Sequence, residues 1–466
     1  MRGRHRLHPP HLQHRPIAPQ LREPGGDAPQ RLLIDLPVRA EPAQGSQRPA
    51  HRGILRGALP GEHRPETGGE LRGGQHRGQA AGLGQGIVGG VGRGGGHTGE
   101  RIESAPPGKE VPAVPPVRTC TLPGSEDRPP RRRTRDEGAE MEYVKLGSTG
   151  MDVSRLCLGT MGFGDPEAWI HPWVLEEEAA RPVIQHALDA GITFFDTANV
   201  YSLGRSEEIV GKALADYADR DEIVLATKVH GTMREAPNGG GLSRKAILAE
   251  AEHSLRRLGT DYIDLYIIHR WDYDTPIEET MRALDDLVRS GKVRYIGASA
   301  MFAWQFQKAQ HVAEVNGWTR FVSMQNHYNL LYREEEREMM PLLRDQGVGS
   351  TPYSPLAAGR LTRDWDADTD RARTDSIAKS KYDATETTDR VIVEQVARIA
   401  EERGVPRVHV ALAWLLAKDP VAAPLIGATR TGHIDSALGA LDLTLTAEEI
   451  AALEEPYVPH RVVGAI

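Results

Sequence analysis

Short apolar runs alternate with stretches of helical periodicity from Met141 to the C-terminus. Runs rich in β-branched and aromatic residues are typical of buried strands. Eight such runs predict strands over 156–160, 192–197, 222–229, 262–269, 293–299, 320–326, 349–355 and 422–429. Ahead of them, residues 143–156 combine alternating apolar positions with glycine-containing turn residues, and this pattern predicts a β-hairpin.

Between and after these runs, apolar residues recur every three or four positions, as in a helix that packs on one face. The predicted helices span 176–191, 206–217, 243–259, 276–291, 302–317, 333–347, 389–404, 407–419 and 446–456. Ser243 and Gly259 are typical start and stop signals, and Thr446 with Glu449 predicts a capping box. The polar stretch 362–387 predicts a long loop.

The alternation of strand and helix predicts an α/β protein, a (β/α)8 TIM barrel with an N-terminal β-hairpin, over residues 141–466. A doubly wound sheet is the competing architecture. It needs a glycine-rich phosphate-binding turn after its first strand, and the stretch 156–164 (LCLGTMGFG) is a weak candidate for that turn.

Residues 1–140 differ sharply in composition from the rest of the chain. All 6 Phe, 7 Trp and 12 Tyr occur at or after Tyr143, and Lys109 is the only lysine before Met141. A Gly-, Pro- and Arg-rich segment of this kind buries too little apolar surface to offset its chain entropy, so we expect a disordered extension. A further hypothesis is that translation of the native protein starts at Met141.

Two motifs in this extension suggest a binding function, but a non-functional interpretation is favoured for each. The stretch 84–89 (GQGIVG) matches the GxGxxG dinucleotide pattern, but no strand precedes it and more glycines follow, so we reject it. The run 128–135 (RPPRRRTR) is either a nucleic-acid or targeting tail or a solvated charge run, and the second interpretation is favoured.

Charge and cysteine content exclude several classes of protein. The net charge of −8 argues against a general nucleic-acid binder. With 2 Cys, Cys120 and Cys157, we expect no disulfide framework or cysteine-based zinc site, and a reducing cytoplasmic location fits. No apolar run reaches the roughly 18 residues of a transmembrane helix, and the N-terminus lacks the apolar core of a secretory signal.

In a (β/α)8 barrel, reactive side chains lie at the carboxyl ends of the strands. The predicted strand ends are polar or small, namely Gly159, Thr160, Asp196, Lys228, His269, Ser299, Gln325, Asn326, Tyr353, Ser354, Gly427, Ala428 and Thr429. Because these residues end otherwise apolar runs, they predict a lined pocket.

Asp196, Lys228 and His269 end three successive strands, and Tyr201 follows Asp196 by one loop turn. A tyrosine pKa is ordinarily about 10, and a nearby lysine lowers it. Asp196 can keep Lys228 charged, and a neutral His269 can donate a hydrogen bond to a substrate oxygen. The four residues predict a general acid beside a carbonyl, and because they supply no hydride, a nicotinamide cofactor is implied.

Each of these residues also has an ordinary interpretation: a helix cap for Asp196, a rim aromatic for Tyr201, a solvated strand end for Lys228 and a core histidine for His269. Their occurrence together at successive strand ends favours chemistry. Metal binding is not expected, because His269 has no second His or Cys at ligand spacing.

Seven stretches resemble, in order, the aldo-keto reductase superfamily: 194–214 (FFDTANVYSLGRSEEIVGKAL), 226–229 (ATKV), 264–272 (DLYIIHRWD), 290–299 (SGKVRYIGAS), 324–331 (MQNHYNLL), 353–361 (YSPLAAGRL) and 426–429 (IGAT). The HRWD tetrapeptide with residues 275–299 is similar to its microbial aryl-alcohol-dehydrogenase-like branch. The resemblance covers about 141–460. It implies a TIM barrel, NADPH-dependent carbonyl reduction and a catalytic tetrad of Asp196, Tyr201, Lys228 and His269.

The resemblance also implies cofactor contacts from Gly159, Thr160, Asp196, Ser299, Gln325, Tyr353, Ser354, Leu356, Gly359, Arg360, Gly427, Thr429, Arg430 and His433. Ser299 and Gln325 match positions that hold the nicotinamide amide, and Tyr353 matches the ring stacked on it. Residues 354–360 match the pyrophosphate stretch. Thr429 and Arg430 match the adenosine 2′-phosphate site, and a solvated cation at a helix start is the alternative for Arg430.

Two departures from the family pattern concern the cofactor. Ala300 stands where many members have Asn or Ser. His433, Ser436 and Ala437 stand where many place Gln or Arg, then Glu and Asn, against adenine. These departures predict a loosely held adenine end, so NADH is an alternative to NADPH (NADP+), the cofactor that the resemblance implies.

The predicted function is NADPH-dependent reduction of a small aldehyde or ketone, reversible as alcohol oxidation, with no nucleic-acid or membrane partner. The alternative is a regulatory subunit that resembles the cofactor-binding β-subunits of potassium channels, which keep the tetrad. Loops 163–175, 231–242 and 362–387 are expected to select the substrate. Trp169 and Trp271 are candidate pocket walls, with core packing as an equal alternative.

Overall fold

The structure is a computed structural model that describes residues 141–167, 170–367, 369 and 373–464. The predictions for residues 1–140 and for Trp169 lie outside the described residues.

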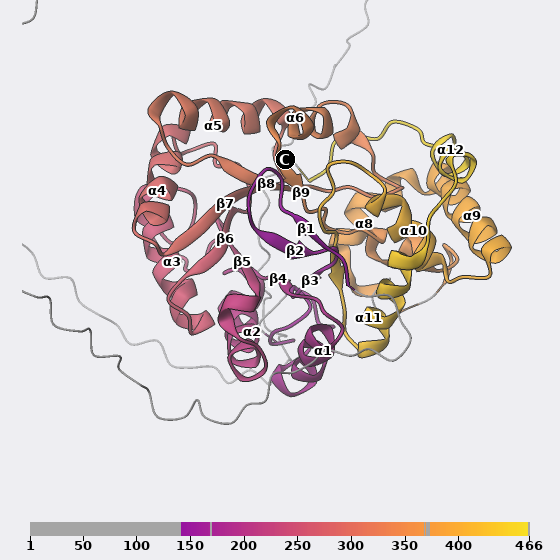
Figure 1. The fold of residues 1–466 in the computed structure, drawn as a ribbon, viewed down its shortest axis with the longest axis horizontal. Coiled ribbons are helices and arrows are strands. Elements are labelled where there is room, and N and C mark those ends of the chain that lie inside the picture. The colour runs from indigo at the N-terminus through magenta and orange to yellow at the C-terminus, as the bar shows by residue number, and fades with distance from the viewer. Residues whose placement is uncertain (1–140, 168–169, 368, 370–372, 465–466) are drawn as a thin grey trace, which may run out of the picture. The chain divides into compact units, whose positions relative to one another are not determined.

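Eight parallel strands form one sheet in the order β10-β3-β4-β5-β6-β7-β8-β9. They are β3 (Cys157–Gly159), β4 (Phe194–Asp196), β5 (Val224–Val229), β6 (Ile263–Ile268), β7 (Val293–Ser299), β8 (Phe321–Gln325), β9 (Gly349–Ser350) and β10 (Leu425–Gly427). Ser350 bridges Val421, and Leu425 N donates to the Pro352 carbonyl at 2.8 Å, so the two edges of the sheet meet. The curled sheet with its outer helices confirms the predicted (β/α)8 fold (Figure 1).

A hairpin of β1 (Tyr143–Lys145) and β2 (Asp152–Ser154) covers the amino-terminal end of the barrel. Leu146 and Val153 from this hairpin are fully buried. They pack with residues inside the barrel near the strand starts, including Cys157, Phe194 and Val224. The predicted hairpin is therefore confirmed, and it seals the end of the barrel opposite the polar strand ends.

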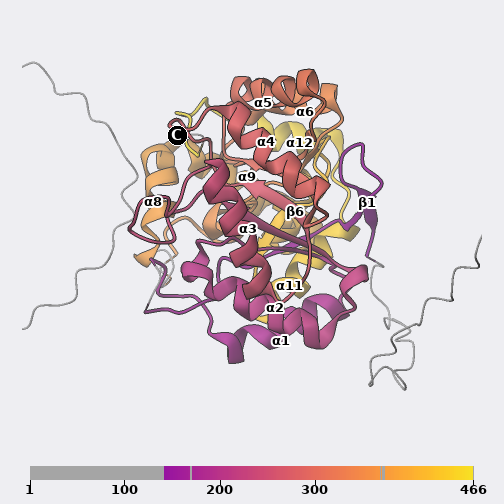
Figure 2. The same cartoon turned by 90° about the vertical axis from the view of Figure 1, so that its left-hand side faces the viewer.

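Helices surround the sheet in chain order, as Figures 1 and 2 show. The first six are α1 (Glu177–Asp189), α2 (Arg205–Tyr217), α3 (Arg244–Leu258), α4 (Ile277–Arg289), α5 (Ala303–Asn316) and α6 (Met339–Gln346). Those after β9 are α8 (Ser376–Tyr382), α9 (Glu386–Arg403), α10 (Arg407–Leu416), α11 (Thr431–Leu438) and α12 (Ala447–Glu454). The caps at Ser243 and Thr446 and the left-handed stop at Gly259 are confirmed.

Two predicted elements differ in the structure. The expected loop 362–387 contains α8, whose seven residues are too few to show a repeating apolar pattern. Asp375 caps this helix by accepting a hydrogen bond from Ala378 N at 2.8 Å. The expected helix 333–347 is divided into a 3₁₀ turn (Glu334–Glu336) and α6, because the backbone leaves the helical region at Glu338.

The chain returns to the barrel after α12. Tyr457 OH donates to Glu334 Oε1 at 2.8 Å, and His460 Nε2 lies 2.9 Å from the buried Asp389 Oδ1. Further along, the Arg270 guanidinium donates a hydrogen bond to the Gly464 carbonyl. Because Arg270 directly follows His269, this segment ends beside the carboxyl end of β6.

We expect Leu146→Ala to lower the free energy of unfolding by about 2–5 kcal/mol, because it leaves a cavity under the sealed end of the barrel. Lys145→Ala, next to it on the exposed side of the hairpin, is the matched control and is expected to change the value by less than about 1 kcal/mol. Urea denaturation measures both. Equal effects of the two substitutions would show that the hairpin does not seal the core.

A second prediction concerns His460. Burial lowers its pKa, but the hydrogen bond and charge of Asp389 raise it more, so the pKa stands above its ordinary value. Such a group stabilises the fold fully below its unfolded pKa of about 6.5, and this contribution is lost as the pH rises through the folded value. Urea denaturation of His460→Gln should therefore show a larger loss of stability at about pH 5.5 than at about pH 8. A loss that grows with pH contradicts this linkage.

Candidate active site

A buried ion pair joins the ends of β4 and β5. Lys228 Nζ donates to Asp196 Oδ1, and neither side chain is more than 2% exposed. The same ammonium donates to the Thr197 carbonyl at 2.8 Å and to Tyr201 OH at 3.1 Å. The three donors of the ammonium thus have three acceptors, which is what a buried charge requires.

A hydrogen bond across the barrel fixes the second oxygen of Asp196. Gln325 Nε2 donates to Asp196 Oδ2 at 2.9 Å, although Gln325 ends β8 and Asp196 ends β4, four strands away around the sheet. The structure therefore brings together side chains that the sequence places 129 positions apart.

Tyr201 starts a tight 3₁₀ turn (Tyr201–Gly204) after β4. Its ring meets the His269 ring edge-on, with 5.8 Å between centroids and 79° between planes. Lys228 and His269 thus flank the phenol, as the sequence predicts. His269 is partly exposed while Tyr201 is 9% exposed, so the phenol lies just inside the mouth of the barrel.

The environment sets the protonation states of this cluster. Burial raises the pKa of Tyr201 more than the charge of Lys228 lowers it, which corrects the expectation of a net lowering. Burial lowers the pKa of Lys228, but Asp196 and Tyr201 raise it more, so the net shift is upward. Burial and the charge of Lys228 hold the pKa of His269 well below its usual value. Near neutral pH, the phenol and the imidazole are therefore neutral and the ammonium is charged.

Several residues that the resemblance assigns to cofactor binding make hydrogen bonds that support the tetrad. Thr160 Oγ1 donates to the Asp196 carbonyl at 2.9 Å, and Ser299 Oγ donates to the Gln325 carbonyl at the same distance. Gly427 and Gly159 are in register with Asp196 on neighbouring strands, so they lie at the same level of the barrel.

Tyr353 lies beside this cluster on the β9 side. Its ring stacks on His327, with centroids 5.3 Å apart and 8° between planes, and Lys381 Nζ lies 4.7 Å from its centroid. Its hydroxyl is buried and has no hydrogen-bond partner among the described residues. The following turn contains left-handed backbone at Ser354 (φ 55°) and Gly359 (φ 89°), and Leu356 between them is partly buried.

The two arginines matched to phosphate differ in their surroundings. The Arg360 guanidinium pairs with Asp383 and lies 4.9 Å from the centre of the Trp365 ring, so it is held within the protein. Arg430 is exposed at the start of α11, and its Nε lies 2.9 Å from His433 Nε2. Thr429 N lies 3.3 Å from the other ring nitrogen of His433. Thr429, Arg430 and His433 therefore form one cluster.

Sequence reasoning missed two cations near the site. Burial raises the pKa of Tyr201, and the positive charge of Arg270 offsets part of that rise. The position of Arg270 directly after His269 in the sequence was an available signal. The pKa of Lys381 falls to about 8, first because of burial and then because of Arg270. The sequence did not predict that Lys381 lies near the site, because the segment that forms α8 was expected to be a loop. The ring centroids of Trp271 and Trp304 are 6.0 Å apart, and Trp271 packs against the main apolar core. These contacts favour core packing over a pocket wall for Trp271.

Within the described parts of residues 141–464, no group of three or more His, Cys, Asp or Glu side chains could hold a metal ion. No helix in the same part of the chain is both long and apolar enough to cross a membrane.

Comparison with known proteins gives concordant matches. Residues 155–457 match the model of the aldo/keto reductase family. The chain is 46% identical over 342 residues to the versiconal hemiacetal acetate reductase of Aspergillus parasiticus, covering 69% of this chain and 98% of that protein. It is 45% identical over 349 residues to the aldo-keto reductase dtxS3 of Metarhizium robertsii, covering 70% and 93%.

A Schizosaccharomyces pombe protein assigned by name to the aryl-alcohol dehydrogenases is 44% identical over 350 residues, covering 70% of this chain and 98% of its own length. The matched span contains every strand of the barrel and all four residues of the tetrad. The chain therefore belongs to the aldo/keto reductase family and is an oxidoreductase that acts on carbonyl and alcohol groups.

Proposed function

We propose that this protein reduces an aldehyde or a ketone with NADPH and that Tyr201 donates the proton. The observation that carries the proposal is a buried series of hydrogen bonds, in which the Lys228 ammonium donates both to Asp196 and to the Tyr201 hydroxyl. The name of the Aspergillus parasiticus relative, a hemiacetal acetate reductase, supports reduction at a carbonyl-derived carbon.

The residues present fit a nicotinamide cofactor. Tyr353 presents an aromatic ring beside the tetrad, and its buried hydroxyl has no hydrogen-bond partner within the part of the chain that the structure describes. Ser299 and Gln325 lie at adjacent strand ends. Arg430 is an exposed guanidinium at the start of α11, where a phosphate is favoured by both its fork of donors and the helix dipole. When bound, NADPH supplies the hydride.

The tetrad then handles the proton. Because the pKa of Tyr201 is raised, the phenol keeps its proton near neutral pH and can give it to the carbonyl oxygen. The phenolate left behind accepts a hydrogen bond from the Lys228 ammonium, which Asp196 keeps charged. A neutral His269 can donate a hydrogen bond to the same oxygen and orient it.

We expect Tyr201→Phe to reduce kcat for carbonyl reduction by about 100-fold or more, because it removes the proton donor, while the Kd for NADPH stays nearly unchanged. A panel of carbonyl substrates followed by NADPH absorbance measures kcat, and cofactor fluorescence measures Kd. Retention of most activity in Tyr201→Phe contradicts the assignment.

In the wild type, kcat for reduction should stay level through neutral pH and fall only above about pH 10, as Tyr201 loses its proton.

We also expect Arg430→Ala to raise KM for NADPH by about tenfold and to leave KM for NADH unchanged, because only NADPH carries the 2′-phosphate. Arg398→Ala, which changes an exposed arginine on α9, is the control. Steady-state kinetics with both cofactors decides the matter. A wild-type enzyme with equal kcat/KM for the two cofactors removes the role given to Arg430.

A further inference from the structure

Two side chains of α3 reach the two ends of the turn that carries Tyr201. Glu250, which is 2% exposed, accepts a hydrogen bond from Asn199 Nδ2 at 3.3 Å, two residues before Tyr201. Arg257 packs on Gly204, three residues after Tyr201, so closely that a Cβ there would lie 2.5 Å from Arg257 Cδ. Because Glu250 and Arg257 are two helical turns apart, both project from the same face of α3.

A second buried carboxylate links this face of α3 to the catalytic lysine. Arg257 Nε donates to Glu207 Oε2 at 2.6 Å, and Thr227 Oγ1 donates to Glu207 Oε1 at the same distance. Thr227 directly precedes Lys228 on β5. Asn199, the partner of Glu250, is also linked to this lysine, because its backbone N–H donates to the Lys228 carbonyl at 3.3 Å. Glu250 therefore bonds to a residue two positions before Tyr201, and Glu207 bonds to the residue that precedes Lys228.

The Tyr201 turn needs support from outside itself. Ser202 (φ 46°) and Leu203 (φ 51°) have left-handed backbone, which residues with side chains rarely adopt and which persists only where the surroundings hold it. Leu203 is 52% exposed, so its side chain contributes little to that hold. The contacts of α3 at Asn199 and Gly204 lie on either side of the strained residues.

We propose that Glu250 is a positioning residue, which together with Arg257 holds the turn so that the Tyr201 hydroxyl stays on Lys228. The proposal rests on the proposed function of Tyr201 as proton donor. In this arrangement Glu250 acts on the turn through its hydrogen bond with Asn199.

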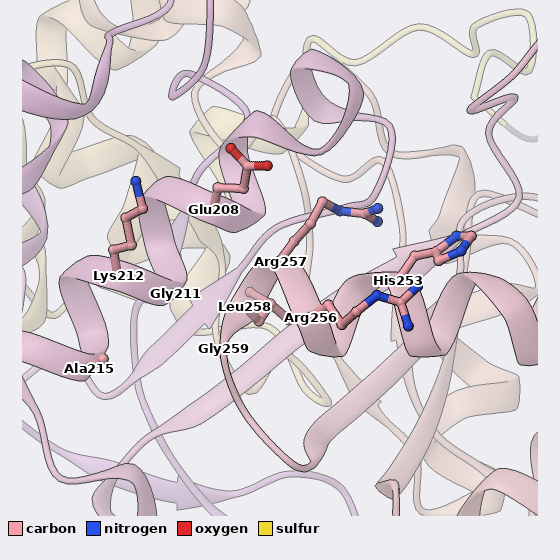
Figure 3. A pocket seen from close by; sticks show the side chains of 9 residues that line it. All are labelled: Glu208, Gly211, Lys212, Ala215, His253, Arg256, Arg257, Leu258 and Gly259. Carbon is pink, nitrogen blue, oxygen red and sulfur yellow. The ribbon is translucent and has the colours of Figure 1, made fainter.

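One carboxylate oxygen of Glu250 lies next to a residue that lines a polar groove. Glu250 Oε1 lies 3.1 Å from His253 Nδ1. His253 lines a groove of about 590 Å³ between α2 and α3, together with Arg256, Arg257 and Lys212 (Figure 3). Because His253 and Arg257, the polar neighbours of Glu250, line this groove, shortening Glu250 is expected to leave the barrel folded.

The test compares Glu250→Ala with Glu252→Ala, a control that removes a partly exposed glutamate, paired with Lys292, from the same helix. We expect Glu250→Ala to lower kcat about tenfold through misplacement of Tyr201, with the Kd for NADPH within about twofold of the wild type. Hydrogen exchange of peptides that span residues 197–204 should be faster in Glu250→Ala and unchanged in the control. Glu250→Gln, whose amide oxygen still accepts from Asn199, should restore most of kcat.

Asn199→Ala cuts the same hydrogen bond from the side of the turn and replaces Glu250→Ala if that variant does not fold. The double variant Glu250→Ala/Asn199→Ala should be no slower than either single variant, since both remove one link. Unchanged kcat and unchanged exchange in the single variants overturn the proposal, as do fully additive losses. If the wild type shows no NADPH-dependent reduction, the proposed function fails, whereas the exchange experiment still decides whether α3 holds the turn.

Discussion

The ion pair between Asp196 and Lys228 is the interaction on which the site depends. A charged ammonium away from water requires a counter-charge and an acceptor for each of its protons. Asp196, the Thr197 carbonyl and the Tyr201 hydroxyl meet that requirement, all within six residues of chain. The demand for a stable buried charge therefore also fixes where the phenol lies.

The two ends of the barrel have different roles: one stabilises the fold, and the other carries the polar site. At the amino-terminal end, the hairpin closes the barrel with apolar contacts from Leu146 and Val153. At the other end, the strands finish in polar side chains that bond to one another, as Gln325 does to Asp196 and Ser299 does to Gln325. A barrel that is open at both ends would hydrate the Lys228 ammonium and remove the environment that sets its pKa.

The sequence predicted every strand of the barrel and the convergence of the tetrad, because periodic apolar runs mark strands and polar residues mark their ends. It did not predict the upward pKa shift of Tyr201, which depends on how deeply the ring is buried. Nor did it predict that Arg360 pairs with Asp383, because that contact forms only when α8 packs against the turn after β9. Glu250 looks like any surface glutamate of an amphipathic helix, and only three-dimensional packing shows that it is buried. Local patterns thus identify elements and their ends, whereas burial and long-range pairing require the folded chain.

The hydrogen bond from Gln325 to Asp196 also bears on the order in which the protein can be made. Asp196, Tyr201, Lys228 and His269 all leave the ribosome before β8 does, yet the second oxygen of Asp196 has its partner only once Gln325 has been synthesised and β8 has joined the sheet. Contacts between residues so distant in sequence form late, because the chain between them must first be ordered. A nascent chain that ends within β7 therefore carries the full tetrad without the bond that orients its carboxylate, so the geometry of the site matures only in the second half of synthesis.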